Sequence, residues 1–93
     1  MADTAKDYLA VINCGGAGSW ARESDKEKAI KNVIRLFRKD FKNYVKLEKG
    51  KSLNIDVVEV TGTGSANVRW DDRSYYTDDK ETIITVETVK RTL

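Results

Sequence analysis

The residues with the clearest chemical potential are eight lysines and arginines that recur every three or four positions between 28 and 49. They are Lys28, Lys31, Arg35, Arg38, Lys39, Lys42, Lys46 and Lys49. At this spacing they share one face of an α-helix, and the nearest acids, Glu27 and Asp40, fall at its borders. Such a cationic face suits the phosphates of a nucleic acid or the surface of an acidic protein. The alternative is an ordinary solvated helix face.

A second set of candidate binding residues is aromatic and lies outside the predicted helix. Its members are Trp20, Trp70, Tyr75 and Tyr76. If these rings are exposed together on a sheet, they could stack nucleobases, as in proteins that bind single strands. The alternative is that they seal the edges of a small core.

The sequence offers little material for catalysis. It contains no histidine, so neither Cys14 nor a serine has the usual base for activation as a nucleophile. One cysteine without histidine cannot build a zinc or iron–sulfur site, and Cys14 itself reads as a small buried residue. The pairs 71–72 and 78–79 are aspartates, which we interpret as turn residues rather than cation ligands. We therefore expect no enzyme, no metal and no other cofactor.

The glycine-rich stretch 15–19 follows a predicted strand but does not predict a phosphate-binding loop. It lacks the full dinucleotide-binding fingerprint and the Gly-Lys-Ser/Thr ending of a P-loop. We interpret residues 15–23 as a connection between a strand and a helix.

The cationic residues belong to the longest periodic segment, which predicts one amphipathic helix over 25–47. Ser24 and Glu27 have the spacing of a capping box at its start, and Gly50 is a stop signal beyond its end. The apolar stripe consists of Ile30, Val33, Ile34, Phe37, Phe41, Tyr44 and Val45, widened by Ala29, Leu36 and Leu47. A helix of this extent would be roughly 34 Å long.

The start of this helix, Ser24–Asn32, resembles the helix start of HicB-type antitoxins. In that family a serine or threonine precedes an acidic pair, an alanine, an aliphatic residue and an asparagine. The resemblance covers nine residues, and Lys28 stands where the family carries an acid. Any capping box joined to an amphipathic helix produces the same pattern, so the resemblance implies no membership.

The remaining segments predict strands. Residues 8–14 and 81–89 are rich in strand formers, and 53–60 alternates apolar and polar residues except at Val57 and Val58. That exception indicates either a bulge or burial on both faces. Residues 68–70 and 75–77 predict short strands. The order β-α-β-β-β(-β) predicts an α+β two-layer sandwich, with one long helix on a mostly antiparallel sheet of four to five strands. If 8–14 and 53–60 are neighbours, a right-handed crossover makes them parallel.

Length and composition fit one domain over 1–93, with a loose start at 1–6. No segment predicts a membrane span or a signal peptide, and the single cysteine favours a reducing, cytoplasmic setting. The net charge is only +2, but it is divided between a basic helix and acidic later turns. We expect a small binding module that contacts nucleic acid or an acidic protein through its cationic helix face. The alternative is a regulatory accessory protein of the phage or mobile-element kind, for which a homodimer formed through its sheet is one arrangement.

Overall fold

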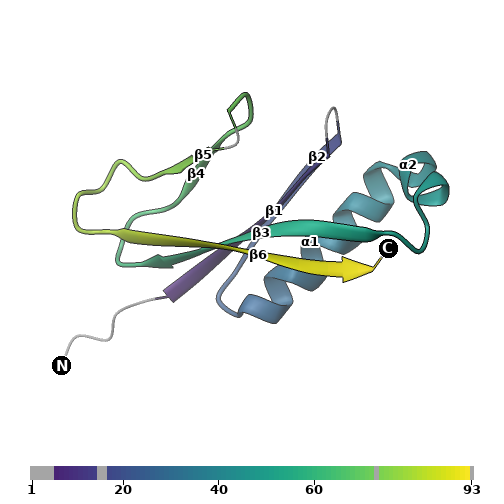
Figure 1. The fold of residues 1–93 in the computed structure, drawn as a ribbon. Coiled ribbons are helices and arrows are strands. Elements are labelled where there is room, and N and C mark those ends of the chain that lie inside the picture. Colours follow the sequence, from purple (N-terminus) through teal and green to yellow (C-terminus); the bar gives the residue numbers. More distant parts are fainter. Residues whose placement is uncertain (1–5, 15–16, 73, 93) are drawn as a thin grey trace.

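The computed structural model describes residues 6–14, 17–72 and 74–92, and its fold is α+β (Figure 1). The expected loose start therefore lies outside the described residues, except for Lys6, which begins the first strand. The elements in chain order are β1 (Lys6–Cys14), β2 (Ala17–Glu23), α1 (Lys26–Asp40), α2 (Lys42–Leu47), β3 (Ser52–Thr61), β4 (Asn67–Arg69), β5 (Ser74–Tyr76) and β6 (Ile83–Thr92).

Four of the strands form one antiparallel sheet in the order β2-β1-β3-β6. The other two, β4 and β5, pair only with each other and form a separate ribbon. The predicted α+β class and the antiparallel sheet are thereby confirmed. The predicted sandwich with one long helix is not confirmed.

Strand β2 occupies residues that we expected to form a loop. It pairs with β1 from Tyr8 opposite Glu23 to Cys14 opposite Ala17. Glycine and serine lower the strand propensity of this segment, so pairing with β1, rather than local preference, makes it extended. The signal that could have predicted it is the Gly15–Gly16 pair between two extended runs, which is typical of a hairpin. Those two glycines lie outside the described residues.

The extra strand also corrects the predicted direction of β3. Because the hairpin reverses the chain before α1, β3 returns antiparallel to β1, with Ala10 opposite Val57. The predicted parallel pair with a right-handed crossover is therefore wrong.

The predicted continuous helix is divided at Phe41, whose backbone is not helical (φ −125°, ψ 52°). The break packs two rings on Phe37, with centroids 5.2 Å away for Phe41 and 5.5 Å away for Tyr44. Leu47, predicted to widen the apolar stripe, is 82% exposed.

The helix cap is Asp25, whereas the capping-box spacing predicted Ser24. The Asp25 carboxylate accepts a hydrogen bond from the backbone N–H of Lys28 at 2.9 Å. Both residues are good capping types, but a carboxylate also interacts favourably with the positive end of the helix dipole.

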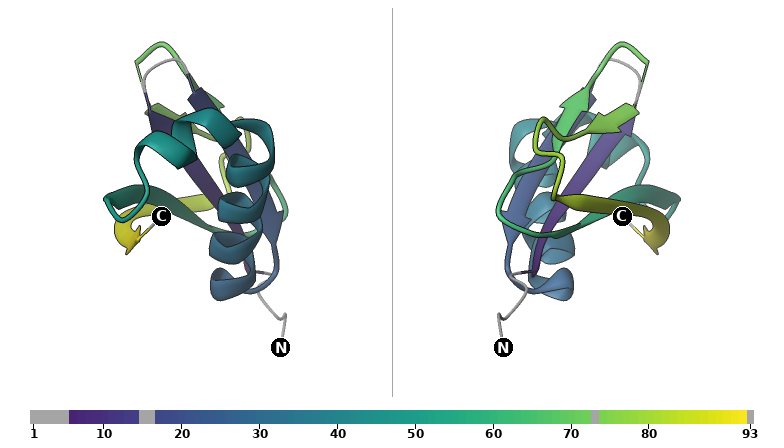
Figure 2. Two further views of the ribbon diagram at one scale, coloured as in Figure 1. Left: turned by 90° about the vertical axis from the view of Figure 1, so that its right-hand side faces the viewer. Right: turned by 90° about the vertical axis from the view of Figure 1, so that its left-hand side faces the viewer.

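The middle strands of the sheet, β1 and β3, have residues buried on both faces. Helix α1 covers one face, where Phe37, Ile12 and Val57 belong to the larger core. The β4–β5 ribbon covers part of the other face, where Leu9, Val58 and Ala66 form a smaller core. Figure 2 shows α1 in front of the sheet from one side and the ribbon in front from the opposite side. Val57 and Val58 thus point to different cores, which confirms burial on both faces as the reason for the broken alternation.

Two ion pairs join the start of α1 to the edge strand β6. Lys26 pairs with Glu87, and Arg91 pairs with Glu27 at 3.3 Å. The bond to Glu87 raises the pKa of Lys26 above its ordinary value. Among the described residues, no helix is long and apolar enough to cross a bilayer.

Candidate functional site

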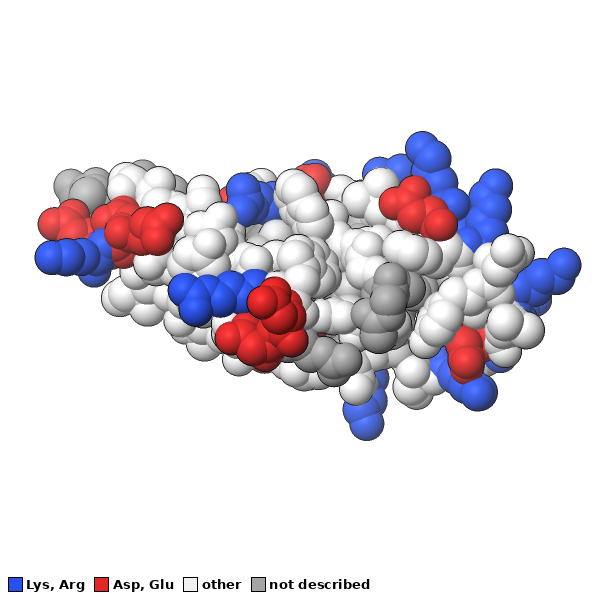
Figure 3. Space-filling view, turned by 90° about the horizontal axis from the view of Figure 1, so that it is seen from above, with Lys and Arg blue, Asp and Glu red and all other residues white. Residues whose placement is uncertain are grey.

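The eight cations of the predicted face are all exposed on α1, on α2 or just after it. None of them pairs with a carboxylate in the described parts of the chain, whereas Lys6, Lys26, Lys51 and Arg91 all do. Figure 3 shows lysine and arginine side chains projecting from the end of the molecule that carries α2, at the right of the view. These charges are therefore available to a partner.

The break at Phe41 does not separate the cations of the two helices. Arg38 on α1 and three lysines from α2 and the turn after it border one shallow hollow of about 480 Å³. Val45 also lines this hollow, and the three lysines are Lys42, Lys46 and Lys49. Four cations around one hollow concentrate positive charge at one place on the surface.

A second hollow extends the same surface along α1. It has a volume of about 360 Å³ and is lined by Lys31, Ile34, Arg35 and Arg38. Because Arg38 borders both hollows, the cationic surface continues from Lys31 to Lys49. Lys39 lies on a neighbouring hollow with Asp40, and Lys28 is exposed near the helix start.

The four predicted aromatic residues do not act as one cluster. The Tyr75 hydroxyl donates a hydrogen bond to Asp56 at 2.6 Å, and the ring packs on the smaller core. Burial, followed by this carboxylate, raises the pKa of Tyr75 above its ordinary value. Tyr75 is therefore a structural residue, and its prediction as a contact residue is not supported.

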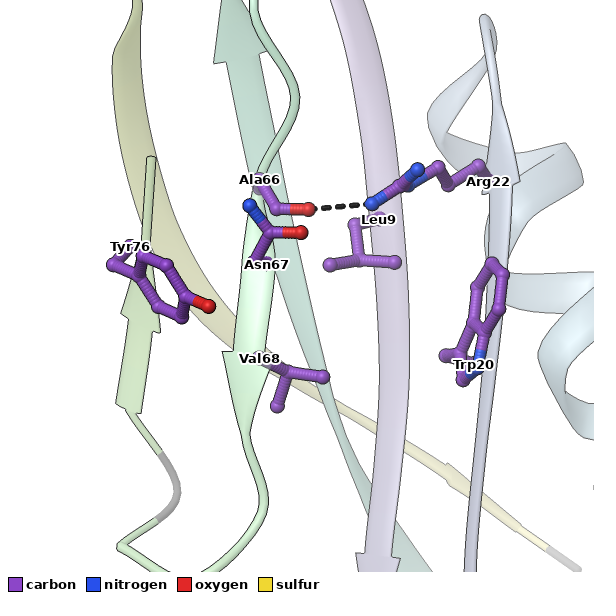
Figure 4. Close-up of a pocket in the computed structure, with 7 residues that line it drawn as sticks. All are labelled: Leu9, Trp20, Arg22, Ala66, Asn67, Val68 and Tyr76. Atoms are coloured by element: carbon purple, nitrogen blue, oxygen red, sulfur yellow. Dashed lines mark hydrogen bonds between the residues drawn. The ribbon is translucent and has the colours of Figure 1, made fainter. Parts of the chain in front are cut away.

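Trp20 and Tyr76 meet at a pocket between the sheet and the ribbon (Figure 4). This aromatic pocket has a volume of about 210 Å³ and is lined by Leu9, Trp20, Arg22, Ala66, Asn67, Val68 and Tyr76. Trp20 from β2 and Tyr76 from β5 stand on opposite sides of it, with Asn67 and Val68 between them. Trp20 is 52% exposed, so about half of this residue remains accessible for contacts.

Trp70 is 40% exposed but does not line the aromatic pocket. Its ring lies against Gly18 of β2, where an added Cβ would stand 3.0 Å from the Trp70 ring. Trp70 therefore braces the ribbon against the sheet edge.

Two arginines associated with the pocket rings were not predicted as site residues. The Arg22 guanidinium lies 5.5 Å from the centre of the Trp20 ring and donates a hydrogen bond to the Ala66 carbonyl at 2.6 Å. The Arg69 guanidinium lies 4.7 Å from the centre of the Tyr76 ring. The signal for Arg22 is its spacing, because a residue two positions after Trp20 shares its face only if the segment is a strand.

One aspartate of each pair, Asp72 and Asp79, accepts hydrogen bonds within a turn, as the sequence interpretation expected. Asp72 accepts hydrogen bonds from the backbone and the hydroxyl of Ser74. Asp79 accepts from the hydroxyls of Thr82 and Thr63, at 2.7 and 3.2 Å, and from the backbone of Glu81. These bonds, with that from Thr82 first, lower the pKa of Asp79. In the described part of the chain, no three cysteine, aspartate or glutamate residues gather as metal ligands.

Cys14 is only half-buried, so its prediction as a buried residue is wrong in degree. It ends β1 beside Tyr44 of α2, and this neighbour raises the pKa of the Tyr44 hydroxyl. The exposure follows from its place at the sheet end, where α2 covers the core incompletely.

Comparison of the chain with protein-family models, with curated proteins and with solved structures finds no match.

Proposed function

We propose that this chain is a small non-catalytic binding module whose cationic helix face binds nucleic acid. One observation carries the proposal: Arg38, Lys42 and Lys46, together with Lys49, surround a single hollow and have no carboxylate partner among the described residues. Holding four like charges together without counter-charges is unfavourable, and a bound polyanion relieves that repulsion.

The chemistry of the face favours phosphates over bases as the groups contacted. Flexible lysine and arginine side chains on an exposed helix flank reach the backbone of a nucleic acid first. Such contacts carry little sequence information, so binding should be broad. Exposed acids at Asp71, Asp72 and Asp78 would repel a long polyanion that strays from the helices.

Salt dependence tests this proposal directly. We expect the dissociation constant for a labelled duplex or single strand, measured by fluorescence anisotropy, to rise steeply with salt. If four to six cations contact phosphates, the log–log slope of the binding constant is about −3 to −5.

A charge-reversal variant locates the binding face. Changing Arg35, Arg38 and Lys42 together to glutamate should abolish duplex binding without unfolding the protein, because all three are exposed. The matched control reverses the same number of charges at Lys6, Lys80 and Lys90, which are exposed elsewhere. It should bind the duplex much more tightly than the variant at Arg35, Arg38 and Lys42. No retention of the wild type on DNA or RNA at about 50 mM salt contradicts the proposal. An acidic protein surface is then the partner class to test.

A second candidate function is supported by the edge strand β6. This strand has ten residues, and its outer edge pairs with nothing in the described chain. Ile83 and Val86 on it are 66% and 46% exposed. Unpaired strand edges of this length readily accept another strand, so a homodimer through β6 is the alternative.

The mass in solution distinguishes the two candidates. A dimer by analytical ultracentrifugation, converted to a monomer by Val86→Lys, supports the alternative, because a lysine on the edge disfavours strand pairing. Thr85→Lys changes a neighbouring exposed position on the other face of β6. If both lysine variants are monomers, the dimer forms through the strand edge, and if only Val86→Lys is a monomer, it forms through the face that carries Val86. A monomer at all concentrations excludes the dimer and has no bearing on nucleic-acid binding by the cationic helix face.

A further inference from the structure

We infer that the aromatic pocket between the sheet and the ribbon binds one unstacked nucleobase of a single-stranded nucleic acid. The pocket lies on the face of the sheet opposite α1 and is therefore separate from the cationic helix face. This inference goes beyond the proposed function and stands or falls independently of it.

The size of the pocket restricts the ligand to about one ring system. Pockets for drug-sized molecules occupy about 300–1,000 Å³, and this one has about 210 Å³. The rings of Trp20 and Tyr76 line opposite sides of it, with Asn67 and Val68 between them (Figure 4). Each ring offers a flat surface for stacking, because every nucleobase presents a π-face.

The charges at the pocket select against a cationic ligand. Aromatic walls can also hold quaternary ammonium groups, but such sites attract a positive charge. Here Arg22 lines the pocket, Arg69 lies over the Tyr76 ring, and no carboxylate belongs to the described lining. The arginines would repel a cation and attract the phosphate that accompanies a nucleobase.

The polar groups suit the edge of a base. The Asn67 side chain lines the pocket and offers both a donor and an acceptor, and it makes no hydrogen bond within the described residues. Arg22 commits one N–H to the Ala66 carbonyl, which fixes the guanidinium at the pocket mouth. Its remaining donors stay available for a phosphate.

The test uses a labelled hexanucleotide of deoxythymidylate and fluorescence anisotropy at low salt. We expect Trp20→Ala and Tyr76→Ala each to weaken binding about 5- to 150-fold, the range for losing one base–aromatic stack. Trp20→Phe retains a ring and should bind within about threefold of the wild type. Because Trp20 is half-exposed, Trp20→Ala and Trp20→Phe should keep the unfolding midpoint of the wild type, which is measured in parallel for all the variants.

A blunt duplex of about twenty base pairs, long enough to stay paired at low salt, and a free mononucleotide complete the experiment. The duplex should be unaffected by Trp20→Ala, since its bases are not available to the pocket. Suppose that a mononucleotide binds as tightly as the hexanucleotide and with the same sensitivity to Trp20→Ala. That result would support stacking of a base in the pocket and would identify a free nucleotide as the ligand.

The charge-reversal variant at Arg35, Arg38 and Lys42 separates this inference from the proposed function. If the pocket binds, Trp20→Ala must weaken hexanucleotide binding in that background as well. Binding that is lost only in the charge-reversal variant and is insensitive to Trp20→Ala and Tyr76→Ala overturns the inference and supports the helix face alone. Absence of hexanucleotide binding to the wild type also overturns it, whatever the duplex does.

Discussion

Asp79 connects two loops through its carboxylate, which accepts hydrogen bonds from Thr63 and Thr82. The Thr82 hydroxyl in turn accepts a hydrogen bond from the backbone of Gly64 at 2.8 Å. There is no room for a larger residue, because a Cβ on Gly64 would stand 2.7 Å from the Asp79 Cβ. This contact holds the chain leading into β4 against the chain leading into β6.

The lowered pKa of Asp79 makes a prediction about pH. A carboxyl group whose pKa is lower in the folded state stabilises the protein above its unfolded pKa, about 3.9, and loses that contribution as pH falls. We therefore expect Asp79→Asn to lower the free energy of unfolding most at neutral pH. The difference from the wild type should shrink below about pH 4. Urea unfolding at several pH values measures it.

The control for this prediction is Asp78→Asn, at an exposed neighbour whose side chain makes no hydrogen bond in the described part of the chain. It should track the wild type at every pH. A constant difference between Asp79→Asn and the wild type across the acid range would show that the charge of Asp79 is irrelevant.

Asp25 and Ser24 make a second prediction at the residue scale. Asp25→Ala should lower the free energy of unfolding by about 1 kcal/mol, because it removes the bond to the Lys28 N–H. Ser24→Ala should change it by less than about 0.5 kcal/mol, because Ser24 is exposed and does not cap the helix. Urea unfolding measures both changes. A larger loss for Ser24→Ala than for Asp25→Ala would show that Ser24 caps the helix.

At the scale of elements, α1 carries the packing and α2 contributes mainly charge. Phe37 is fully buried, while α2 has no buried residue. We expect Phe37→Ala to cost about 3–5 kcal/mol and Leu47→Ala less than about 0.5 kcal/mol, because Leu47 is exposed. Unfolding midpoints in urea measure both, and a large cost for Leu47→Ala would mean that α2 packs more closely than described.

The existence and the cationic face of the helix were predictable, but its break was not. The apolar period continues through Phe41, Tyr44 and Val45, so no local signal ends the helix at Asp40. The break accompanies the packing of the Phe41 and Tyr44 rings on Phe37, which no local pattern specifies. Strand β2 was missed for the opposite reason, because its local preferences are weak and only its pairing with β1 makes it regular.

At the scale of the whole molecule, the sequence predicted the class and the uneven charge but not the second layer on the sheet. Burial of β3 on both faces could be inferred from Val57 and Val58, although nothing identified the covering ribbon. Strands β4 and β5 have three residues each, too few for a pattern to specify pairing. The aromatic pocket was unpredictable for the same reason, since it exists only where β2 meets this ribbon.

The antiparallel contact between β1 and β3 has a consequence for the rate of folding. The β1–β2 hairpin joins neighbouring segments, and such hairpins form within about 1–10 μs. Strand β3 can pair with β1 only after the chain has closed around β2, α1 and α2, which is a slower event with a larger entropic cost. Strand β6 then pairs with β3, which is its one strand neighbour among the described residues. We therefore expect β3 to pair late in folding, after the β1–β2 hairpin and α1 have formed.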